Sequence, residues 1–470
     1  MAKQSREVIS VRPTQILVLL ILASVSLVVV VRNYNNALTL TEDVLVTPKQ
    51  SLNKIHKSID IANDSYRHNQ SAICSKDVSP MLLSEWRHSK ENICSSNEVS
   101  IEQFRLDRWE YKPAVTVYKN VVVNNLYDDI KTTNESCEEI DSVSNTLRND
   151  TFANTTVINH PVLRVKTFAT FNAYERFHSI INTGMVMAML NITNPQLVYL
   201  VSEREMKNQH MLSKVLEFWS SFSTLKPILV EVPEAGKTDF KSDQSKIVLP
   251  YVVDFPFHGT SIMVTKTDGA LRGRGLDHHC KSEIFRGISN FIRMNWGIDD
   301  ELSDENEVST PVQVLWSSRG AYCCHPDTGE MYTPSRSIVN EQELVQAVQA
   351  SLGSQYNITM VNFGTNMTSS DSAKAAYNSQ ILVGVHGAGL VWSAFMKQHT
   401  GIVEMFGGDR SSVNRHYHNI ASLADIHYRS LTLQSGGGKV LIWNEKSVDQ
   451  IVEKIRSINF DEEPGADEPW

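Results

Sequence analysis

One stretch near the C-terminus constrains the fold of this chain more than any other. Residues 381–395 read ILVGVHGAGLVWSAF, an apolar run of strand length that breaks at glycines and resumes with helical spacing. This pattern predicts a strand, a turn and a helix. In an open α/β sheet, ligands bind where strands end and helices begin, because small turn residues let a ligand approach and free helix N–H groups attract phosphate. His386 in that turn is therefore either a site residue or a buried, hydrogen-bonded histidine.

The same alternation of strands and helices surrounds this stretch. The apolar patterns predict strands at 311–317, 358–363 and 401–406, and helices at 341–351, 372–377, 388–396, 415–423 and 447–458. Strands that alternate with helices favour a parallel sheet with right-handed crossovers.

Charged residues gather at one predicted edge of that sheet. Glu404 lies near the end of its strand on the same edge as His386, and Arg319 and Arg336 can reach this edge. Arginine binds phosphate well, and a carboxylate suits ribose hydroxyls. The sequence therefore predicts a site for a nucleoside diphosphate.

Two other motifs are excluded. A dinucleotide fingerprint needs a third glycine where this chain has Trp392, and it would follow the first strand of the domain. An esterase oxyanion loop needs a Gly-x-Ser-x-Gly elbow, and the chain contains none.

The N-terminus carries an apolar segment at residues 16–31, preceded by Lys3, Arg6 and Arg12. A helix of this length rises about 24 Å, which suits a thin early secretory membrane. A cleaved signal peptide is the alternative, but Val28 to Val31 offer no small-residue cleavage site. With basic residues in front, we expect a type II signal anchor with a cytosolic tail at residues 1–15 and a lumenal remainder.

Other sequence features agree with a lumenal location. Eight Asn-x-Ser/Thr sequons predict glycosylation at Asn63, Asn69, Asn134, Asn149, Asn154, Asn191, Asn357 and Asn366. Six cysteines in an oxidising compartment predict disulfides, whose pairing the sequence leaves open. No Cys-x-x-Cys occurs, which argues against a zinc site.

Length and composition suggest two folded domains after a stem. The 470 residues allow more than one core, and a net charge of −9 argues against nucleic acid as a partner. We expect a stem at 32–110, an α/β domain at 111–300, an acidic hinge, and a Rossmann-like domain at 311–460. In the first domain the patterns predict strands near 121 and at 162–169, 197–201, 228–232 and 247–253, and helices at 174–190, 211–222 and 282–294.

An ordered set of motifs resembles one enzyme family. The motifs are NAYERFHSI at 172–180, SRGAY at 318–322, HP at 325–326, GEMYTPSRSIVNE at 329–341, HGAGL at 386–390 and VE at 403–404. Across roughly residues 160–460 the chain resembles the plant-type β-1,2-xylosyltransferase family, which also includes the O-GlcNAc transferase acting on EGF domains. The resemblance implies type II Golgi or ER enzymes that use UDP-sugars, invert the anomeric centre and have two Rossmann-like domains facing across a cleft (GT-B). It implies a donor side at 311–460, an acceptor side at 111–300, and donor-binding residues Arg319, Arg336, His386, Gly387, Gly389 and Glu404.

The resemblance is incomplete where a catalytic base is expected. Family members carry an aspartate at a position similar to Asn182 or to Ser179, and this chain has neither carboxylate. Inversion in one displacement needs a group that takes the acceptor proton. His178 and Glu175 are the candidates, since helical spacing places them on one face; alternatively, His178 packs beneath the cleft.

These observations predict a UDP-sugar-dependent glycosyltransferase of the Golgi (or ER) membrane. The preferred reaction moves xylose to an N-glycan of a glycoprotein. The alternatives are an O-linked N-acetylglucosaminyl- or other pentosyl- or hexosyltransferase of the same family, or an inactive sugar-binding relative. No Asp-x-Asp triplet occurs, so we expect no metal and no cofactor, with arginines and helix N–H groups neutralising the diphosphate.

Overall fold

The computed structural model describes residues 86–95, 100–105, 114–123, 155–166, 172–202, 209–232, 246–256, 263, 281–298, 311–320, 336–364, 367–407, 415–435 and 440–464. All of them lie in the compact unit Ser51–Trp470. No helix in these ranges is long and apolar enough to cross a membrane. The tail at 1–15, the anchor expected at 16–31 and most of the expected stem lie outside the described residues.

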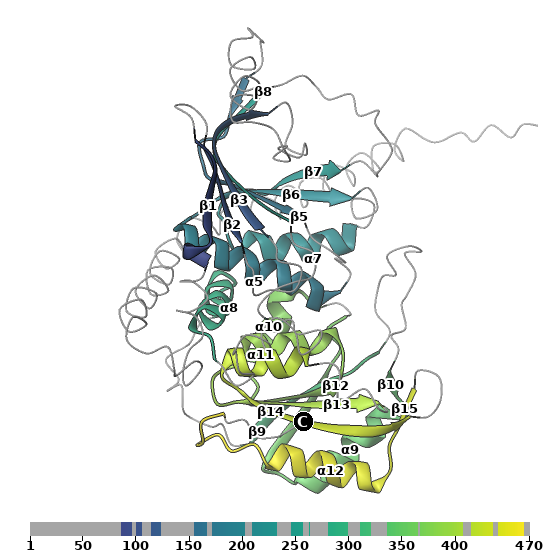
Figure 1. Cartoon of the computed structure of the whole chain (residues 1–470). Coiled ribbons are helices and arrows are strands. Elements are labelled where there is room, and N and C mark those ends of the chain that lie inside the picture. Colours follow the sequence, from purple (N-terminus) through teal and green to yellow (C-terminus); the bar gives the residue numbers. More distant parts are fainter. Residues whose placement is uncertain are drawn as a thin grey trace, which may run out of the picture. The chain divides into compact units, whose positions relative to one another are not determined.

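The C-terminal half, residues 311–464, is built on one sheet (Figure 1). Its strands are β9 (Val312–Ser317), β10 (Ser337–Ile338), β11 (Tyr356–Val361), β12 (Ile381–Val385), β13 (Gly401–Gly407), β14 (His427–Ser435) and β15 (Val440–Ile442). They lie in the order β11-β9-β12-β13-β14-β15-β10. The ladders from β11 to β14 are parallel, which confirms the predicted parallel sheet, whereas β15 is antiparallel to β14. The sequence analysis did not predict β10, β14 and β15.

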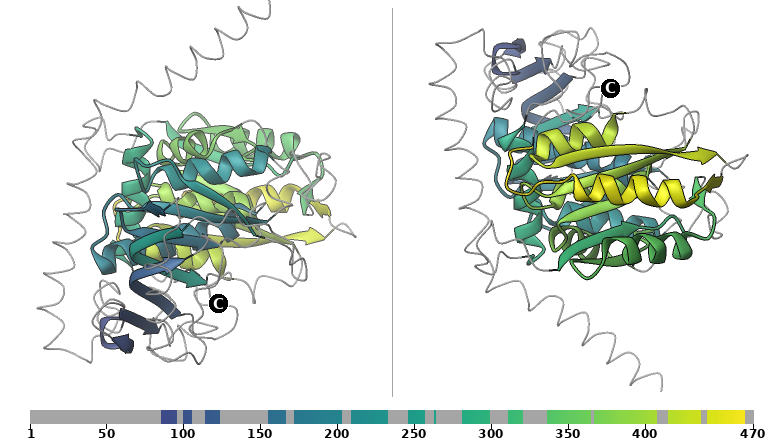
Figure 2. Two further views of the ribbon diagram at one scale, coloured as in Figure 1. Left: turned by 90° about the horizontal axis from the view of Figure 1, so that it is seen from above. Right: turned by 90° about the horizontal axis from the view of Figure 1, so that it is seen from below.

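Helices cover both faces of this sheet, and the right view of Figure 2 shows α9 and α12 side by side on one of them. The helices are α9 (Glu341–Leu352), α10 (Ser369–Tyr377), α11 (His416–Ala424) and α12 (Glu445–Arg456). Leu382 and Ile402 belong to the hydrophobic cluster of α10 and α11, whereas their neighbours Val383 and Val403 belong to that of α9 and α12. A strand buried on both faces is mostly apolar, which explains the apolar run of β12 and, apart from Glu404, that of β13.

The helix expected at 388–396 is instead a 3₁₀ helix, η2 (Ala388–Phe395). Glycine has low helix propensity, and Gly387 and Gly389 stand at its start. Both glycines lie against side chains from the end of β9. The 3₁₀ conformation of this segment therefore goes with both the low helix propensity of the glycines and their close packing against these side chains.

The N-terminal half, residues 86–298, contains a mixed sheet. Its strands are β1 (Lys90–Ser95), β2 (Ser100–Arg105), β3 (Ala114–Val123), β4 (Thr155–Val157), β5 (Val162–Lys166), β6 (Gln196–Ser202), β7 (Ile228–Val232) and β8 (Lys246–Pro256). They lie in the order β1-β2-β3-β8-β5-β6-β7, with β4 beside β8. Neighbours in the series β8-β5-β6-β7 pair in parallel. Neighbours in the series β1-β2-β3-β8 pair antiparallel.

The start of this sheet corrects the predicted stem. Strands β1 and β2 lie within residues 32–110, and Ile101 and Phe104 of β2 are buried. β2 gains this burial by pairing with β3, which the local composition of residues 90–105 does not indicate. The structured part therefore begins before residue 111.

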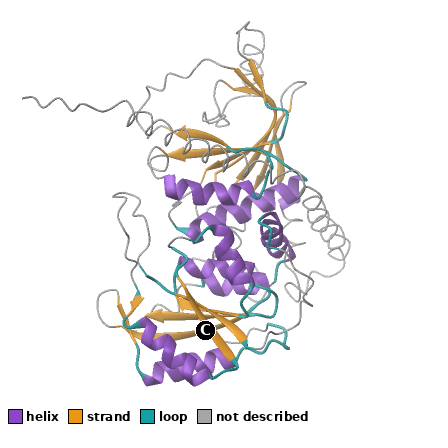
Figure 3. Cartoon of the chain, turned by 180° about the vertical axis from the view of Figure 1, so that it is seen from behind, coloured by secondary structure: helices purple, strands orange, loops and turns teal. Residues whose placement is uncertain are grey.

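The helices of the two halves share one hydrophobic cluster. The N-terminal half contributes α5 (Ala173–Leu190), α7 (Gln209–Ser220) and α8 (Glu283–Asn295), close to the bounds predicted for them. The Phe177 ring lies 5.5 Å from that of Phe395, and the Phe218 ring stacks 5.7 Å from that of Trp392. Figure 3 shows these helices between the sheets. Because side chains from both halves are buried in it, this cluster holds the halves together.

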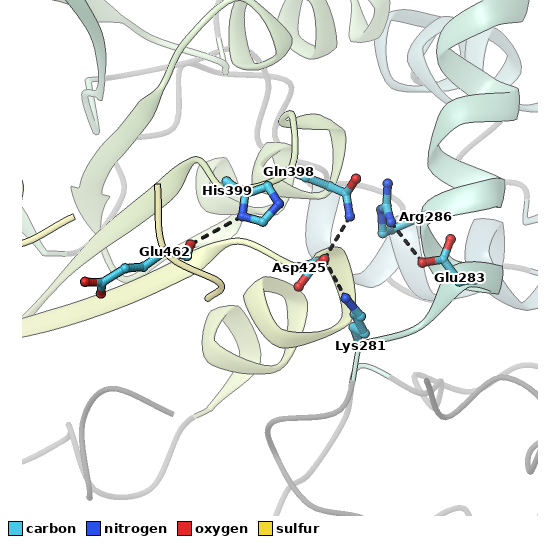
Figure 4. A network of polar contacts seen from close by, with 7 residues as sticks. All are labelled: Lys281, Glu283, Arg286, Gln398, His399, Asp425 and Glu462. Atoms are coloured by element: carbon cyan, nitrogen blue, oxygen red, sulfur yellow. Dashed lines mark hydrogen bonds and ion pairs between the residues drawn. The ribbon is translucent and has the colours of Figure 1, made fainter. Parts of the chain in front are cut away.

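A polar network adds to this junction at the end of α11 (Figure 4). The Asp425 carboxylate accepts hydrogen bonds from Lys281, at 3.2 Å, and from Gln398, at 2.8 Å. The backbone N–H of Ser282, the N-cap of α8, donates to the carbonyl oxygen of Leu423 at 3.1 Å. The start of α8 is thereby fixed to the end of α11.

Candidate functional site

The turn after β12 lies where the connections of the C-terminal sheet change direction. Numbered in chain order among themselves, the five parallel strands from β11 to β14 have the order 2-1-3-4-5, so the crossover direction reverses between β9 and β12. Ligands in open α/β sheets bind outside the carboxyl ends of the strands at such a switch point. Arg319 follows β9 and His386 follows β12. Their side chains are therefore presented where this fold places a ligand.

Two glycines allow the chain to pack tightly at this turn, residues 386–389. The guanidinium Nη1 of Arg319 donates a 3.0 Å hydrogen bond to the carbonyl oxygen of His386. A Cβ atom at Gly387 would lie 1.4 Å from that nitrogen, and one at Gly389 would lie 2.6 Å from the Ser317 hydroxyl oxygen. Glycine at both positions thus brings Arg319 and the turn into contact.

A buried carboxylate holds the imidazole of His386. Nδ1 of His386 hydrogen-bonds Oε1 of Glu404, and the Tyr428 hydroxyl donates to Oε2 at 2.7 Å. Glu404 is 0 % exposed, and both of its oxygens are engaged. The structure shows this carboxylate supporting His386, whereas the expected contact of Glu404 with ribose stays a prediction. With Nδ1 directed at the carboxylate, Nε2 is the nitrogen left for a ligand.

Glu341 is a positioning residue to which the sequence analysis gave no role. Its carboxylate accepts from the Trp316 indole N–H at 2.9 Å and from the Ser318 hydroxyl at 2.5 Å. It stands at the N-terminus of α9, where the helix dipole favours negative charge. Glu341 thereby fixes the backbone just before Arg319. In the sequence, the acidic residue at the start of the helix predicted at 341–351 was the signal for this position.

Arg336 occupies a different part of the sheet. It precedes the edge strand β10, and β15 and β14 lie between β10 and β13. Its backbone has φ 68°, a left-handed conformation that a non-glycine residue rarely adopts. The structure therefore gathers Arg319, His386, Gly387 and Gly389 at one turn, while Arg336 starts from the edge of the same sheet.

The candidates for the base lie on α5, across from this turn. His178 is 1 % exposed, and its ring meets the Tyr174 ring edge-on at 4.6 Å. Ser179 and Asn182, where family members carry aspartate, are also buried. The side chain of Glu175 lies outside the described residues. For His178, the structure agrees with the alternative that it packs beneath the site.

A histidine that the sequence analysis did not select links the two halves. His416 begins α11, and its ring stacks on Tyr174 with centroids 4.4 Å apart and planes 15° apart. The centroid of the same ring is 6.0 Å from that of His386. No local sequence pattern indicates this position, because residues 174, 386 and 416 meet only through the packing of α5 and α11.

Part of this geometry, the contact of Arg319 with the turn of His386, falls within a segment that resembles known enzymes. Residues 177–403 match the family model described as Glycosyltransferase 61. The match supports a glycosyltransferase and the coarser family assignment drawn from the motifs. It runs from Phe177 in α5 through the turn at His386 to Val403 in the first part of β13. Comparison with curated proteins found no match.

Solved structures add no argument to the glycosyltransferase assignment. Three variants of the flavo di-iron protein from Thermotoga maritima are similar at 9 % identity, with TM-scores of 0.21, 0.23 and 0.22. The alignments cover 78 % of this chain and 98, 97 and 98 % of the respective structures. Scores of this size do not establish a common fold.

Two of the predicted glycosylation sites, Asn191 and Asn357, lie in described residues. Asn191 is exposed and ends α5 in a left-handed conformation. Asn357 is exposed on the edge strand β11, and its side-chain amide donates to Gln313 at 2.9 Å. The remaining six sequons and the side chains of all six cysteines lie outside the described residues.

Proposed function

We propose that this chain is an inverting glycosyltransferase that moves xylose from UDP-xylose to an N-glycan of a glycoprotein. The observation that carries the proposal is the contact of Arg319 with the glycine turn of His386 at the switch point of the sheet, within the segment that matches glycosyltransferase 61. Xylose and the N-glycan rest on the family resemblance of the motifs.

In this proposal the diphosphate of the donor lies against the turn at residues 386–389. Arg319 offers a fixed positive charge, and the start of η2 offers backbone N–H groups. Nε2 of His386 faces the leaving phosphate, while the buried carboxylate of Glu404 compensates the charge of the ring when it is protonated. Such fixed donors stabilise the charge that develops on the departing UDP by a few kcal/mol each.

The proposed cellular setting follows from the N-terminus. The apolar segment at 16–31 would anchor the chain in the Golgi or ER membrane, with the enzyme in the lumen. The exposed sequons at Asn191 and Asn357 support this topology, because glycans are added in that compartment.

A second candidate function is sugar binding without turnover. It is favoured by the missing carboxylates at Ser179 and Asn182 and by the burial of His178. A lectin-like relative would bind UDP or a sugar but would form no new glycosidic bond.

One experiment separates these proposals. The full chain, purified in detergent, is incubated with a panel of UDP-sugars and a defined N-glycan, and the product mass is measured. We expect a gain of one pentose with UDP-xylose. A gain of another sugar would correct the donor, and UDP binding without any product would establish the sugar-binding alternative. Addition of EDTA tests the metal-free expectation, which fails if EDTA stops transfer.

A further inference from the structure

His416 lies at the mouth of the donor site as the fold defines it. A helix that follows a parallel strand begins at the carboxyl edge of the sheet, and α11 follows β13 in this way. β13 neighbours β12, so the start of α11 and the turn of His386 occupy adjacent positions on one edge. The centroid distance of 6.0 Å between His416 and His386 agrees with this placement.

Exposure distinguishes His416 from the base candidates chosen from the motifs. His416 is half-buried, whereas His178 is 1 % exposed and covered by the edge of Tyr174. A general base must come within hydrogen-bond distance of the hydroxyl that it deprotonates. An acceptor sugar reaches a half-buried ring without unpacking α5, but it reaches His178 only if that helix moves.

We propose that His416 is the group that takes the acceptor proton, an inference that rests on the proposed glycosyl transfer. The acceptor hydroxyl oxygen attacks C1 of the donor sugar, and its proton moves to an unprotonated nitrogen of His416. The bond from C1 to the phosphate oxygen breaks, and its electron pair leaves with UDP beside Arg319 and His386. The imidazolium of His416 then returns its proton to solvent.

The geometry suits an inverting displacement. The attacking and leaving oxygens stand on opposite sides of C1. Different side chains must therefore contact the two oxygens, and both side chains must lie within a few ångströms of the same carbon. His386 is tied to Glu404 through Nδ1 and serves the leaving side. His416, whose ring is tilted 37° from that of His386, serves the attacking side.

Tyr174 is the positioning residue for this base. Its ring stacks on one face of His416, at 4.4 Å and 15°, and is itself buried on α5. Such a stacked pair contributes about 0.5–1.5 kcal/mol and restricts the orientation of the imidazole. The acceptor half thereby contributes to catalysis through Tyr174 even though it lacks the aspartate of the family.

The test compares two half-buried histidines in the full chain, with UDP-xylose and the N-glycan as substrates. We expect His416→Gln to lower kcat about 10²–10⁴-fold, the usual range for a general base, and to leave stabilisation by UDP unchanged. The control His399→Gln changes a histidine of similar exposure, whose ring meets the Glu462 carbonyl oxygen, and keeps kcat. A kcat within twofold of wild type in His416→Gln overturns the inference.

Rescue separates a chemical role from a structural one. Imidazole added to His416→Ala should restore turnover, because the space left by a half-buried ring is open to solvent. Tyr174→Phe should keep kcat, and Tyr174→Leu should lower it with little change in KM. Loss of kcat in His178→Gln but not in His416→Gln would return the base to His178, and a loss of kcat in His416→Ala that imidazole does not reverse would assign His416 a structural role. Absence of transfer by the wild-type chain with every donor overturns the proposed function itself.

Discussion

The backbone N–H of Ser369 donates a 2.8 Å hydrogen bond to the carboxylate of Glu217, 152 positions earlier in the chain. The N–H of Ser370 donates to the other oxygen of the same carboxylate at 2.9 Å. Glu217 belongs to α7 of the N-terminal half, and the two serines begin α10 of the C-terminal half. One side chain therefore satisfies two free N–H groups of a helix in the opposite half, where the helix dipole favours its charge.

This contact predicts that Glu217→Gln destabilises the fold by about 1–2 kcal/mol, the range for a lost helix cap or charged hydrogen bond. Glutamine offers one acceptor oxygen in place of two. Glu217 also offsets the charge of Arg176, whose pKa is lowered to about 10 chiefly by burial, against the opposing effects of Tyr199 and Glu217. Urea unfolding measures the change.

The matched control is Glu283→Gln on α8. Glu283 is 45 % exposed and pairs with Arg286 one turn away at 2.9 Å, so its loss should change the free energy of unfolding by less than about 0.5 kcal/mol. Equal losses in the two variants would show that the contact between α7 and α10 adds no stability.

The glycine turn makes a second prediction. Gly387→Ala should displace the Arg319 guanidinium, because the added Cβ would lie 1.4 Å from Nη1, and UDP affinity should fall about tenfold or more with the lost phosphate contact. Calorimetric titration with UDP measures this. In an Arg319→Ala background the clash is absent, so Gly387→Ala should then have little further effect. An equal loss of UDP affinity in both backgrounds would show that Gly387 affects UDP binding independently of Arg319.

A third prediction concerns the role of Glu404. If Glu404 acts through His386, Glu404→Gln weakens UDP binding about 10–100-fold, the range for a hydrogen bond to a charged group. The same change should have no effect once His386→Ala has removed the ring. A direct contact of Glu404 with ribose would instead weaken UDP equally in both backgrounds.

The fourth prediction tests the strands found in the expected stem. Glu102 of β2 meets Lys90 of β1 at 2.9 Å and Lys119 of β3 at 3.2 Å. Burial by itself raises the pKa of Glu102, but hydrogen bonds and attraction from the two lysines outweigh it and hold the pKa below its ordinary value of 4.5. Because folding lowers this pKa, the stabilisation is present above pH 4.5 and is lost as the pH falls through the pKa of the folded state.

Glu102→Gln should therefore lower the stability at pH 7 by up to about 1 kcal/mol, since both lysines are partly exposed. Thermal unfolding recorded from pH 7 down to about pH 2 should show the two proteins converging at the acid end, below the folded-state pKa of Glu102. High salt should reduce the difference at pH 7 through screening. A difference that is constant with pH would assign the effect to packing instead of charge.

Sequence reasoning found most elements of the C-terminal half because their signals are local. The apolar runs at β9, β12 and β13 are largely buried, and α9 between β9 and β12 buries the apolar residues of one face. β10 and β15 are too short to show a period, and β14 reads HYRSLTLQS, with polar residues interspersed. The position of such a strand is determined by the neighbouring strand with which it pairs.

The sequence by itself determined the parallel sheet, the glycine turn after β12, and the candidates Arg319 and His386, because glycine spacing and apolar periodicity act over a few residues. Only the tertiary structure decided the partners of those side chains. The buried carboxylate of Glu404 binds the imidazole of His386 through one oxygen, and Tyr428 binds its second oxygen. His416 meets Tyr174 although 242 positions separate them in the numbering (416 − 174). Such contacts arise when two sheets and the helices between them bury their apolar surface together, and no local pattern in the chain encodes them.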